Sequence, residues 1–182
     1  MNIALIDAGP IGPGGPYDAY IGDLVRQLGR RGCSVDHLSL PHLKLSHCVG
    51  CWSCWVKTPG RCSLRDDGSR VLRSYLASDL VVFATPLSLG FVSGMMKRML
   101  DRLIPLYCPH IEVYRGECVH TRRYDRYPAV GCLLHRGVYD EEDVSVTQEY
   151  FRRYAFHFQT DLVLEASTDL TPDEVCDAID RL

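Results

Sequence analysis

The chain has 182 residues, 46% of them hydrophobic, which is enough for one well-packed domain and too few for two ordinary ones. Its formal net charge of -3 gives no general electrostatic reason to bind nucleic acid or an anionic membrane, so neither partner is expected. The N-terminus shows no basic leader and no apolar run reaches membrane-spanning length, which predicts a cytoplasmic protein with reduced thiols.

Apolar runs of strand length alternate with helical patterns along the chain, beginning with a strand over residues 2–7 and a helix from Tyr17 to about Leu28. Four further strands are expected over residues 34–40, 80–85, 129–134 and 162–165. Four further helices are expected from Asp66 or Asp67, from Ser93 to about Ile104, from Glu142 to His157 and from Pro172 to Leu182. The stretch from Pro109 to Tyr127 is expected to be irregular.

Five strands alternating with five helices predict a single three-layer α/β sandwich over residues 1–182, with helices on both faces of a five-stranded parallel sheet. Ligands of such sheets bind at the carboxyl ends of the strands. Four irregular loops follow strands there, at residues 8–16, 41–64, 86–92 and 135–140. We therefore expect the functional site among these loops.

The loop at about residues 41–64 holds four of the nine cysteines, in the spacing Cys48-x2-Cys51-x2-Cys54-x7-Cys62. This spacing can gather four thiolates around an iron–sulfur cluster, and three ligands within seven residues favour a cluster over zinc. Ser63 after Cys62 departs from the Cys-Pro ending of bacterial ferredoxin motifs. A structural zinc site and free or disulfide-forming thiols remain as alternatives.

Two tryptophans, Trp52 and Trp55, lie between the candidate ligands. We expect them to anchor the loop on its neighbours, the alternative being that they shield a cluster from water. The remaining cysteines are dispersed and are expected to be small buried hydrophobes: Cys33, Cys108, Cys118, Cys132 and Cys176.

The run from Thr85 to Arg102, TPLSLGFVSGMMKRMLDR, resembles the strand-loop-helix signature of the flavodoxin-like NADPH-dependent FMN reductases. The cysteine segment followed by Arg65-Asp66-Asp67 resembles the version in iron-sulfur flavoproteins, and His120-x2-Arg123-Tyr124 is similar to a segment found among their relatives. The resemblance implies a flavodoxin-like fold with sheet order 2-1-3-4-5, FMN at the carboxyl edge, and a homodimer or homotetramer.

The function that the resemblance implies is that of an FMN-dependent oxidoreductase, with or without a [4Fe-4S] cluster on the four cysteines. Electrons would come from NAD(P)H, bound transiently over the flavin, or from a ferredoxin-like protein, and would pass to a small acceptor. No catalytic side chain is expected, because the flavin supplies the chemistry. A flavin-less metal- or redox-sensing binding protein on the same scaffold is the alternative, and an electron carrier without its own substrate is a third possibility.

Candidate FMN contacts come from three loops. They are Gly9, Gly12, Gly14, Gly15 and Tyr17 in the first loop, Thr85, Pro86, Leu87, Ser88, Leu89, Gly90 and Ser93 in the second, and Gly131 and His135 in the third. The first loop departs from the family pattern because no hydroxyl precedes Tyr17, three prolines lack N–H donors, and Asp18 would repel a phosphate.

Each of these loops also has an ordinary structural interpretation. The first could be a rigid turn, the second a tight turn whose Ser93 caps a helix, and the third a plain connection. The segment with His120, Arg122, Arg123 and Tyr124 could cover a nicotinamide or a neighbouring subunit's flavin, or could be a solvated loop.

Overall fold

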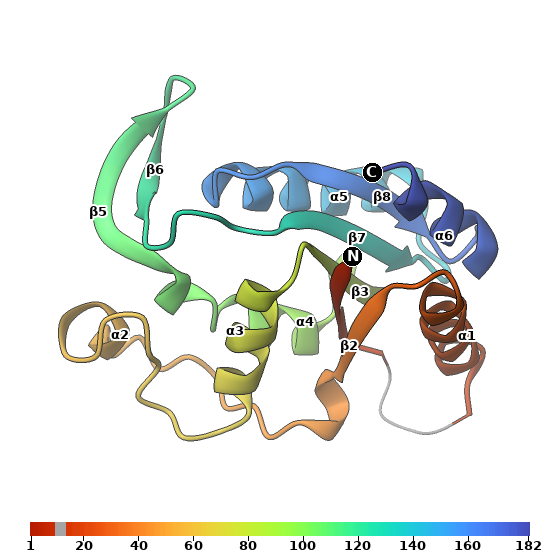
Figure 1. Cartoon of the computed structure of the whole chain (residues 1–182), viewed down its shortest axis with the longest axis horizontal. Helices are drawn as coiled ribbons and strands as arrows, with labels where there is room; N and C mark the ends of the chain where they lie inside the picture. Colours follow the sequence, from red (N-terminus) through yellow and green to blue (C-terminus); the bar gives the residue numbers. More distant parts are fainter. Residues whose placement is uncertain (10–13) are drawn as a thin grey trace.

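The computed structural model describes residues 1–9 and 14–182 (Figure 1). Its centre is a parallel sheet in the order β2-β1-β3-β7-β8, which is 2-1-3-4-5 when only the parallel strands are counted, so the expected topology is confirmed. The parallel strands are β1 (Asn2–Asp7), β2 (Ser34–Ser39), β3 (Leu80–Ser88), β7 (Ala129–His135) and β8 (Leu162–Ser167). A short strand, β4 (Phe91–Val92), turns back antiparallel on the end of β3.

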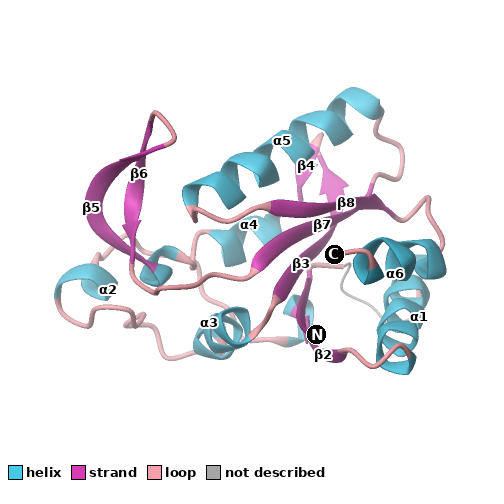
Figure 2. Ribbon diagram, turned by 45° about the horizontal axis from the view of Figure 1, so that its top comes forward, coloured by secondary structure: helices cyan, strands magenta, loops and turns pink. Residues whose placement is uncertain are grey.

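Helices cover both faces of this sheet, as Figure 2 shows. One face carries α1 (Pro16–Arg30) and α6 (Pro172–Asp180), and the other carries α3 (Gly68–Ala77), α4 (Gly94–Leu100) and α5 (Glu141–His157). Three single-turn elements lie in connections: η1 (Leu40–His42), α2 (Ser53–Val56) and η2 (Ile104–Leu106). None of the helices among the described residues has the length and apolar character needed to cross a membrane.

The alternation of side chains along β3 explains why this strand is apolar throughout. Leu80, Val82 and Ala84 pack toward α1 and α6, whereas Val81 and Phe83 pack toward α3, α4 and α5. Both faces of the strand are therefore in the core, as is typical of central parallel strands.

The stretch from residue 109 to 127 is not irregular, and that expectation was wrong. It contains most of a hairpin of β5 (Tyr107–Tyr114) and β6 (Glu117–Arg122), which projects beyond the sheet beside α2 (Figure 1). Its two-residue turn, Arg115 and Gly116, has φ values of 47° and 86°, as type I′ hairpins require. Pro109, which obscured the strand in the sequence, lies where the pairing register shifts between Tyr107 and Ile111.

Three smaller expectations also fail. Leu182 is 58% exposed because α6 ends at Asp180, and α4 ends at Leu100 before the separate turn η2. Cys118 is exposed and Cys33 and Cys108 are half-buried, because they lie on the hairpin or after α1, whereas Cys132 and Cys176 are buried as expected.

Phe83 is the aromatic centre of the core face that carries α5. It is fully buried, stacks on Phe151 with ring centroids 5.5 Å apart, and meets Tyr154 edge-on at 5.3 Å. Replacing it by alanine (F83A) should lower the free energy of unfolding by about 3–5 kcal/mol, because a large cavity remains. Urea denaturation followed by circular dichroism measures this. The control V138A, at a side chain 97% exposed, should change the value by less than about 0.5 kcal/mol.

Candidate functional site

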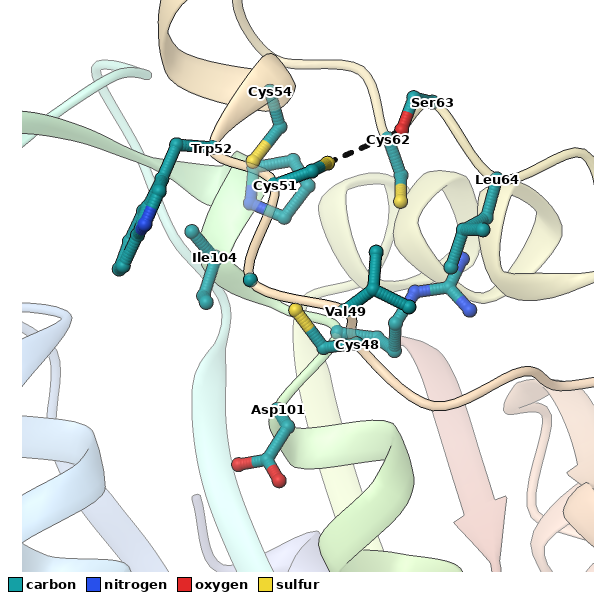
Figure 3. Close-up of a pocket in the computed structure, with 13 residues that line it drawn as sticks. Cys48, Val49, Cys51, Trp52, Cys54, Cys62, Ser63, Leu64, Asp101 and Ile104 are labelled. Carbon is teal, nitrogen blue, oxygen red and sulfur yellow. Dashed lines mark hydrogen bonds between the residues drawn. The ribbon is translucent and has the colours of Figure 1, made fainter.

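The four clustered cysteines line one cavity. Cys48, Cys51, Cys54 and Cys62 all face it, together with Val49, Leu64, Ile104, Pro105 and the side chain of Arg102. Figure 3 shows the four sulfur atoms pointing toward a shared space between the two arms of the loop. The structure thus brings together all four residues that the spacing predicted as ligands.

The loop that carries these cysteines is fastened at both ends. The N–H of Ser46 donates to Asp66 at 2.9 Å, and the N–H of Lys44 donates to Asp67 at 2.7 Å. Asp66 in turn pairs with Arg102, whose guanidinium holds the pKa of that carboxyl well below its usual range. Residues before Cys48 and after Cys62 are therefore joined to each other.

The middle of the loop rests on a group of aromatic and imidazole rings. Trp55 donates from Nε1 to the carbonyl of Ile104 at 3.2 Å and packs 5.0 Å from the ring of His120. His120 stacks on Tyr107 at 5.0 Å and lies 5.3 Å from His157. The anchoring role expected of Trp55 is confirmed, whereas Trp52 stacks on it at 4.7 Å and remains 50% exposed.

The thiols differ in their electrostatic surroundings. Hydrogen bonds with the Ser63 and Ser53 side chains lower the pKa of Cys51 to about 7, and its Sγ lies 3.4 Å from the Ser63 hydroxyl (Figure 3). Burial raises the pKa of Cys54, and the nearby Cys62 raises it further. Local hydrogen bonds therefore favour the thiolate of Cys51, whereas burial favours the neutral thiol of Cys54.

The cavity between the sulfurs is small, about 20 Å³, which is room for roughly one water molecule. Within residues 1–9 and 14–182, no three His, Cys, Asp or Glu side chains form a group that could hold a single metal ion. Zinc requires all its thiolates about 2.3 Å from one ion, and the four thiols do not lie in such an arrangement. Four thiolates are also the donor set of an iron–sulfur cluster.

The second predicted site, at the carboxyl edge of the sheet, is built around the turn that joins β3 to β4. Leu87 pairs with Val92 and Ser88 with Phe91, so Leu89 and Gly90 form the turn, with φ values of 54° and 72°. Leu89 is 94% exposed although a leucine seldom adopts this conformation. An exposed apolar side chain on a strained turn is a feature that clusters at ligand sites.

Thr85 and Ser93, both predicted to contact flavin, have hydrogen bonds that hold this turn together. The Thr85 hydroxyl donates to the Pro86 carbonyl at 2.9 Å and accepts from the Ser93 N–H at 3.2 Å. The Ser93 hydroxyl accepts from the Met96 N–H at 3.2 Å and so caps α4.

The loop after β7 meets the turn after β3. Tyr139 accepts a hydrogen bond from the Leu89 N–H at 2.6 Å, and the Asp143 carboxylate lies so close to Gly90 that a Cβ there would displace it. His135 binds Thr168 through Nδ1 at 2.8 Å and packs 5.5 Å from the ring of Tyr17. Gly131 lies deeper, because a Cβ there would meet Leu164 at 3.0 Å, so its role is close packing of β7 on β8.

A buried carboxylate at the end of β1 was missed in the sequence. Asp7, 5% exposed, accepts from Tyr17 Oη at 2.8 Å and from the Gly9 N–H at 2.9 Å, and lies 3.2 Å from Nε2 of His37. Burial and the Asp7 charge raise the pKa of Tyr17 well above its usual value. The sequence signal that could have revealed this buried carboxylate is a charged residue, Asp7, at the end of an otherwise apolar strand. Gly9 is required here, because a Cβ would lie 2.5 Å from the Tyr17 ring.

The first loop ends in glycines whose amides are the candidate phosphate donors. Gly14 has φ 101°, and its N–H donates to Asp18 at 3.2 Å. Gly15 has open space around it, and Gly12 lies outside the described residues. The carboxylate of Asp18 thus takes a donor that a phosphate would otherwise use.

Two arginines of the segment after β5 have structural contacts. Arg122 donates to the carbonyls of Asp125 and Gln159, and Arg123 donates to those of Pro105 and Tyr107. Together they fasten the base of the hairpin to the domain, so the segment is more than a plain solvated loop.

Comparison with known proteins places these features in a family. The family described as NADPH-dependent FMN reductase matches residues 1–119. An iron-sulfur flavoprotein of Methanocaldococcus jannaschii is 28% identical over 52% of this chain and 48% of its own length. An iron-sulfur flavoprotein of Archaeoglobus fulgidus is 32% identical over 44% of this chain and 36% of its own length. The matched segments thus make up less than half of each of these two relatives.

Solved structures share the fold over almost the whole chain. A flavone reductase superposes with a TM-score of 0.62 at 18% identity, covering 99% of this chain and 60% of that protein. An FMN-dependent NADH-azoreductase of Bacillus anthracis, solved with FMN, superposes with a TM-score of 0.57 at 14% identity, covering 100% and 95%. At these identities the likeness establishes the fold alone.

The lowered pKa of Cys51 predicts a selective reaction. In reduced, metal-free protein, iodoacetamide should alkylate Cys51 with a pH profile centred at about 7, because only the thiolate reacts. Mass spectrometry of peptides after timed quenching measures the rate. The variant S63A should move the profile to higher pH by removing one hydrogen bond, whereas S69A, outside the cavity, should not. Equal profiles for wild-type protein and S63A would contradict this assignment.

The position of Asp18 predicts an effect on flavin affinity. The variant D18N should bind FMN about fivefold more tightly, because it removes repulsion of roughly 1 kcal/mol between the carboxylate and a phosphate. Isothermal titration in matched salt measures the affinity. The control D23N, one turn further along α1 beside Arg26, should leave it unchanged. Weaker binding by D18N would place the phosphate elsewhere.

Proposed function

Because this chain belongs to the NADPH-dependent FMN reductase family, we propose that it is an FMN-dependent oxidoreductase that takes electrons from NAD(P)H and passes them to a small acceptor or a redox protein. FMN supplies hydride acceptance and single-electron release when bound. The observation that carries the proposal is the meeting of three loops at the carboxyl edge, where Tyr17 packs on His135 and Tyr139 holds Leu89.

The chain's own groups have distinct tasks in this proposal. Backbone groups of Pro86 to Gly90 would face the flavin ring, and the exposed Leu89 would exclude water from it. The amides of Gly14 and Gly15, before the start of α1, would bind the phosphate after Asp18 turns away. Asp7 and Tyr17 hold Gly9 in place through one hydrogen-bonded group.

We further propose that Cys48, Cys51, Cys54 and Cys62 bind a [4Fe-4S] cluster. Four thiols around one space support this donor set, as does the presence of iron-sulfur flavoproteins among the relatives. The cluster would exchange single electrons, which suits a partner such as a ferredoxin-like protein. A homodimer or homotetramer is part of the same proposal.

A second candidate function is a flavin-less metal- or redox-sensing protein on the same scaffold. The observation that favours it is the hydrogen bond from Gly14 to Asp18, which satisfies a phosphate donor internally. In that case the cysteine cavity would be the whole functional site and the carboxyl edge would be structural.

One anaerobic preparation separates these functions. Absorption spectrum, released FMN, iron and zinc are measured on the same sample, and NADPH or NADH is then added. The proposal predicts flavin bands, roughly four iron atoms per chain as a [4Fe-4S] cluster requires, and bleaching of the flavin by reduced nicotinamide. A colourless protein that also fails to bind added FMN would support the sensor function. Zinc in place of iron would contradict the proposed iron–sulfur cluster.

A pair of cysteine variants locates the metal. C62S should lose most of the iron while retaining FMN, because it removes one of four ligands at the cavity. C118S, at an exposed cysteine on β6 outside the cavity, is the matched control and should retain both. Iron loss in C118S but not in C62S would place the cluster elsewhere.

A further inference from the structure

Arg102 is a full positive charge that the fold has removed from solvent. Its side chain is 1% exposed, and it lies just beyond the end of α4. Nη1 donates to the Ser46 carbonyl at 2.8 Å and to Asp66 at 2.9 Å, and Nη2 donates to the other oxygen of Asp66 at 2.8 Å. This forked pair is the strong geometry for an arginine and a carboxylate.

One donor of the guanidinium is left over. Nε of Arg102 is buried and has no hydrogen-bond acceptor among residues 1–9 and 14–182. A buried donor without an acceptor is uncommon in folded proteins and calls for a physical explanation. Since the carboxylate of Asp66 already takes the Nη groups, the acceptor for Nε must come from another direction.

The cysteine cavity lies in reach of this donor. Arg102 lines the cavity together with all four cysteines. After Asp66, the pKa of Arg102 is raised by the charge of Cys62 and by a side-chain hydrogen bond with Cys62, which places this sulfur close to the guanidinium. Among the residues that the structure describes, no other arginine lines the cavity.

The surrounding residues leave room for this arginine. A Cβ on Gly68 would lie 2.7 Å from Nη2 of Arg102 and 3.0 Å from Asp66, so only glycine allows the pair to form there. Ser46 and Asp66, the two partners of Arg102, stand on either side of the segment from Cys48 to Cys62. The guanidinium is therefore oriented by both ends of the loop that holds the thiols.

We propose that Arg102 donates its Nε–H to a sulfur of the iron–sulfur group at Cys62 and raises the reduction potential of that group; this rests on the cluster of the proposed function. A cluster on four thiolates is anionic, and reduction adds one electron, supplied by an external reductant, with no proton transferred. A buried cation and an N–H donor stabilise the more negative reduced state more than the oxidised state. Arg102 is thus a positioning and tuning residue.

The test is a redox titration of the anaerobically purified holoprotein, with the reduced cluster followed by electron paramagnetic resonance. R102K keeps a positive charge for Asp66 but loses the Nε–H, and the double variant R102Q/D66N removes both charges so that no carboxylate is left unpaired. Each variant should lower the midpoint potential of the cluster. A shift of about 59 mV corresponds to a tenfold change in this one-electron equilibrium. The flavin potential should not move.

Arg98 provides the matched control. It lies one turn earlier on α4, has a buried Nε like Arg102, and donates to the Leu45 carbonyl at 3.2 Å, but it does not line the cysteine cavity. R98Q should therefore leave the cluster potential unchanged.

The outcomes separate the two proposals. Iron in the unmodified protein supports the proposed cluster. Absence of iron from it would contradict both the cluster and the role of Arg102. With iron present, an unchanged potential in R102K and in R102Q/D66N overturns the role of Arg102 alone. Loss of iron from both variants, with circular dichroism unchanged, would also overturn it, because Arg102 would then only clamp the loop.

Discussion

The parallel pairing of β1, β3 and β7 determines where each candidate flavin-binding residue lies. Because the three strands run side by side in one direction, their loops emerge at the same edge. β1 ends at Asp7, β3 continues to the Leu89 turn, and β7 ends at His135. Helices bury both faces of the sheet, so this edge is where backbone groups can meet a ligand.

Helix α4 joins the two candidate sites. Ser93 caps its first turn beside the Leu89 turn, and Arg102 follows its last turn beside the cysteines. The seven residues of α4, Gly94–Leu100, span about 10 Å at the rise of an α-helix. A single short element therefore fixes the spacing between the flavin-site loops and the cysteine cavity within one chain.

Much of the fold was readable in the sequence because the central strands are apolar throughout and the amphipathic helices have one buried face. The cap at Ser93 and the capping box at Thr171 were local patterns, and both are present. The hairpin of β5 and β6 was not readable, because Pro109 interrupts its pattern and its turn places Arg115 in a left-handed conformation.

The contacts that define the two sites were beyond reach of local patterns. Arg102 and Asp66 are 36 residues apart, and Asp7 meets His37 across 30. Nothing in either local sequence distinguishes these side chains from solvent-exposed charges. Leu89 runs against propensity, since glycine or asparagine is usual at its conformation. The cysteine spacing predicted which thiols gather, but not the arginine that faces them.

The unequal ionisation of the thiols bears on how the protein matures. Cys51 is exposed and, with a pKa lowered to about 7, is partly thiolate at neutral pH, the form that oxidants attack. Oxidised to a sulfenic acid, it would condense with a neighbouring thiol to a disulfide, and two sulfurs joined in that way no longer serve as separate ligands. Loading of the proposed cluster and air oxidation would thus compete for the same thiols, and whichever reaches a newly folded chain first would decide whether the cluster can form.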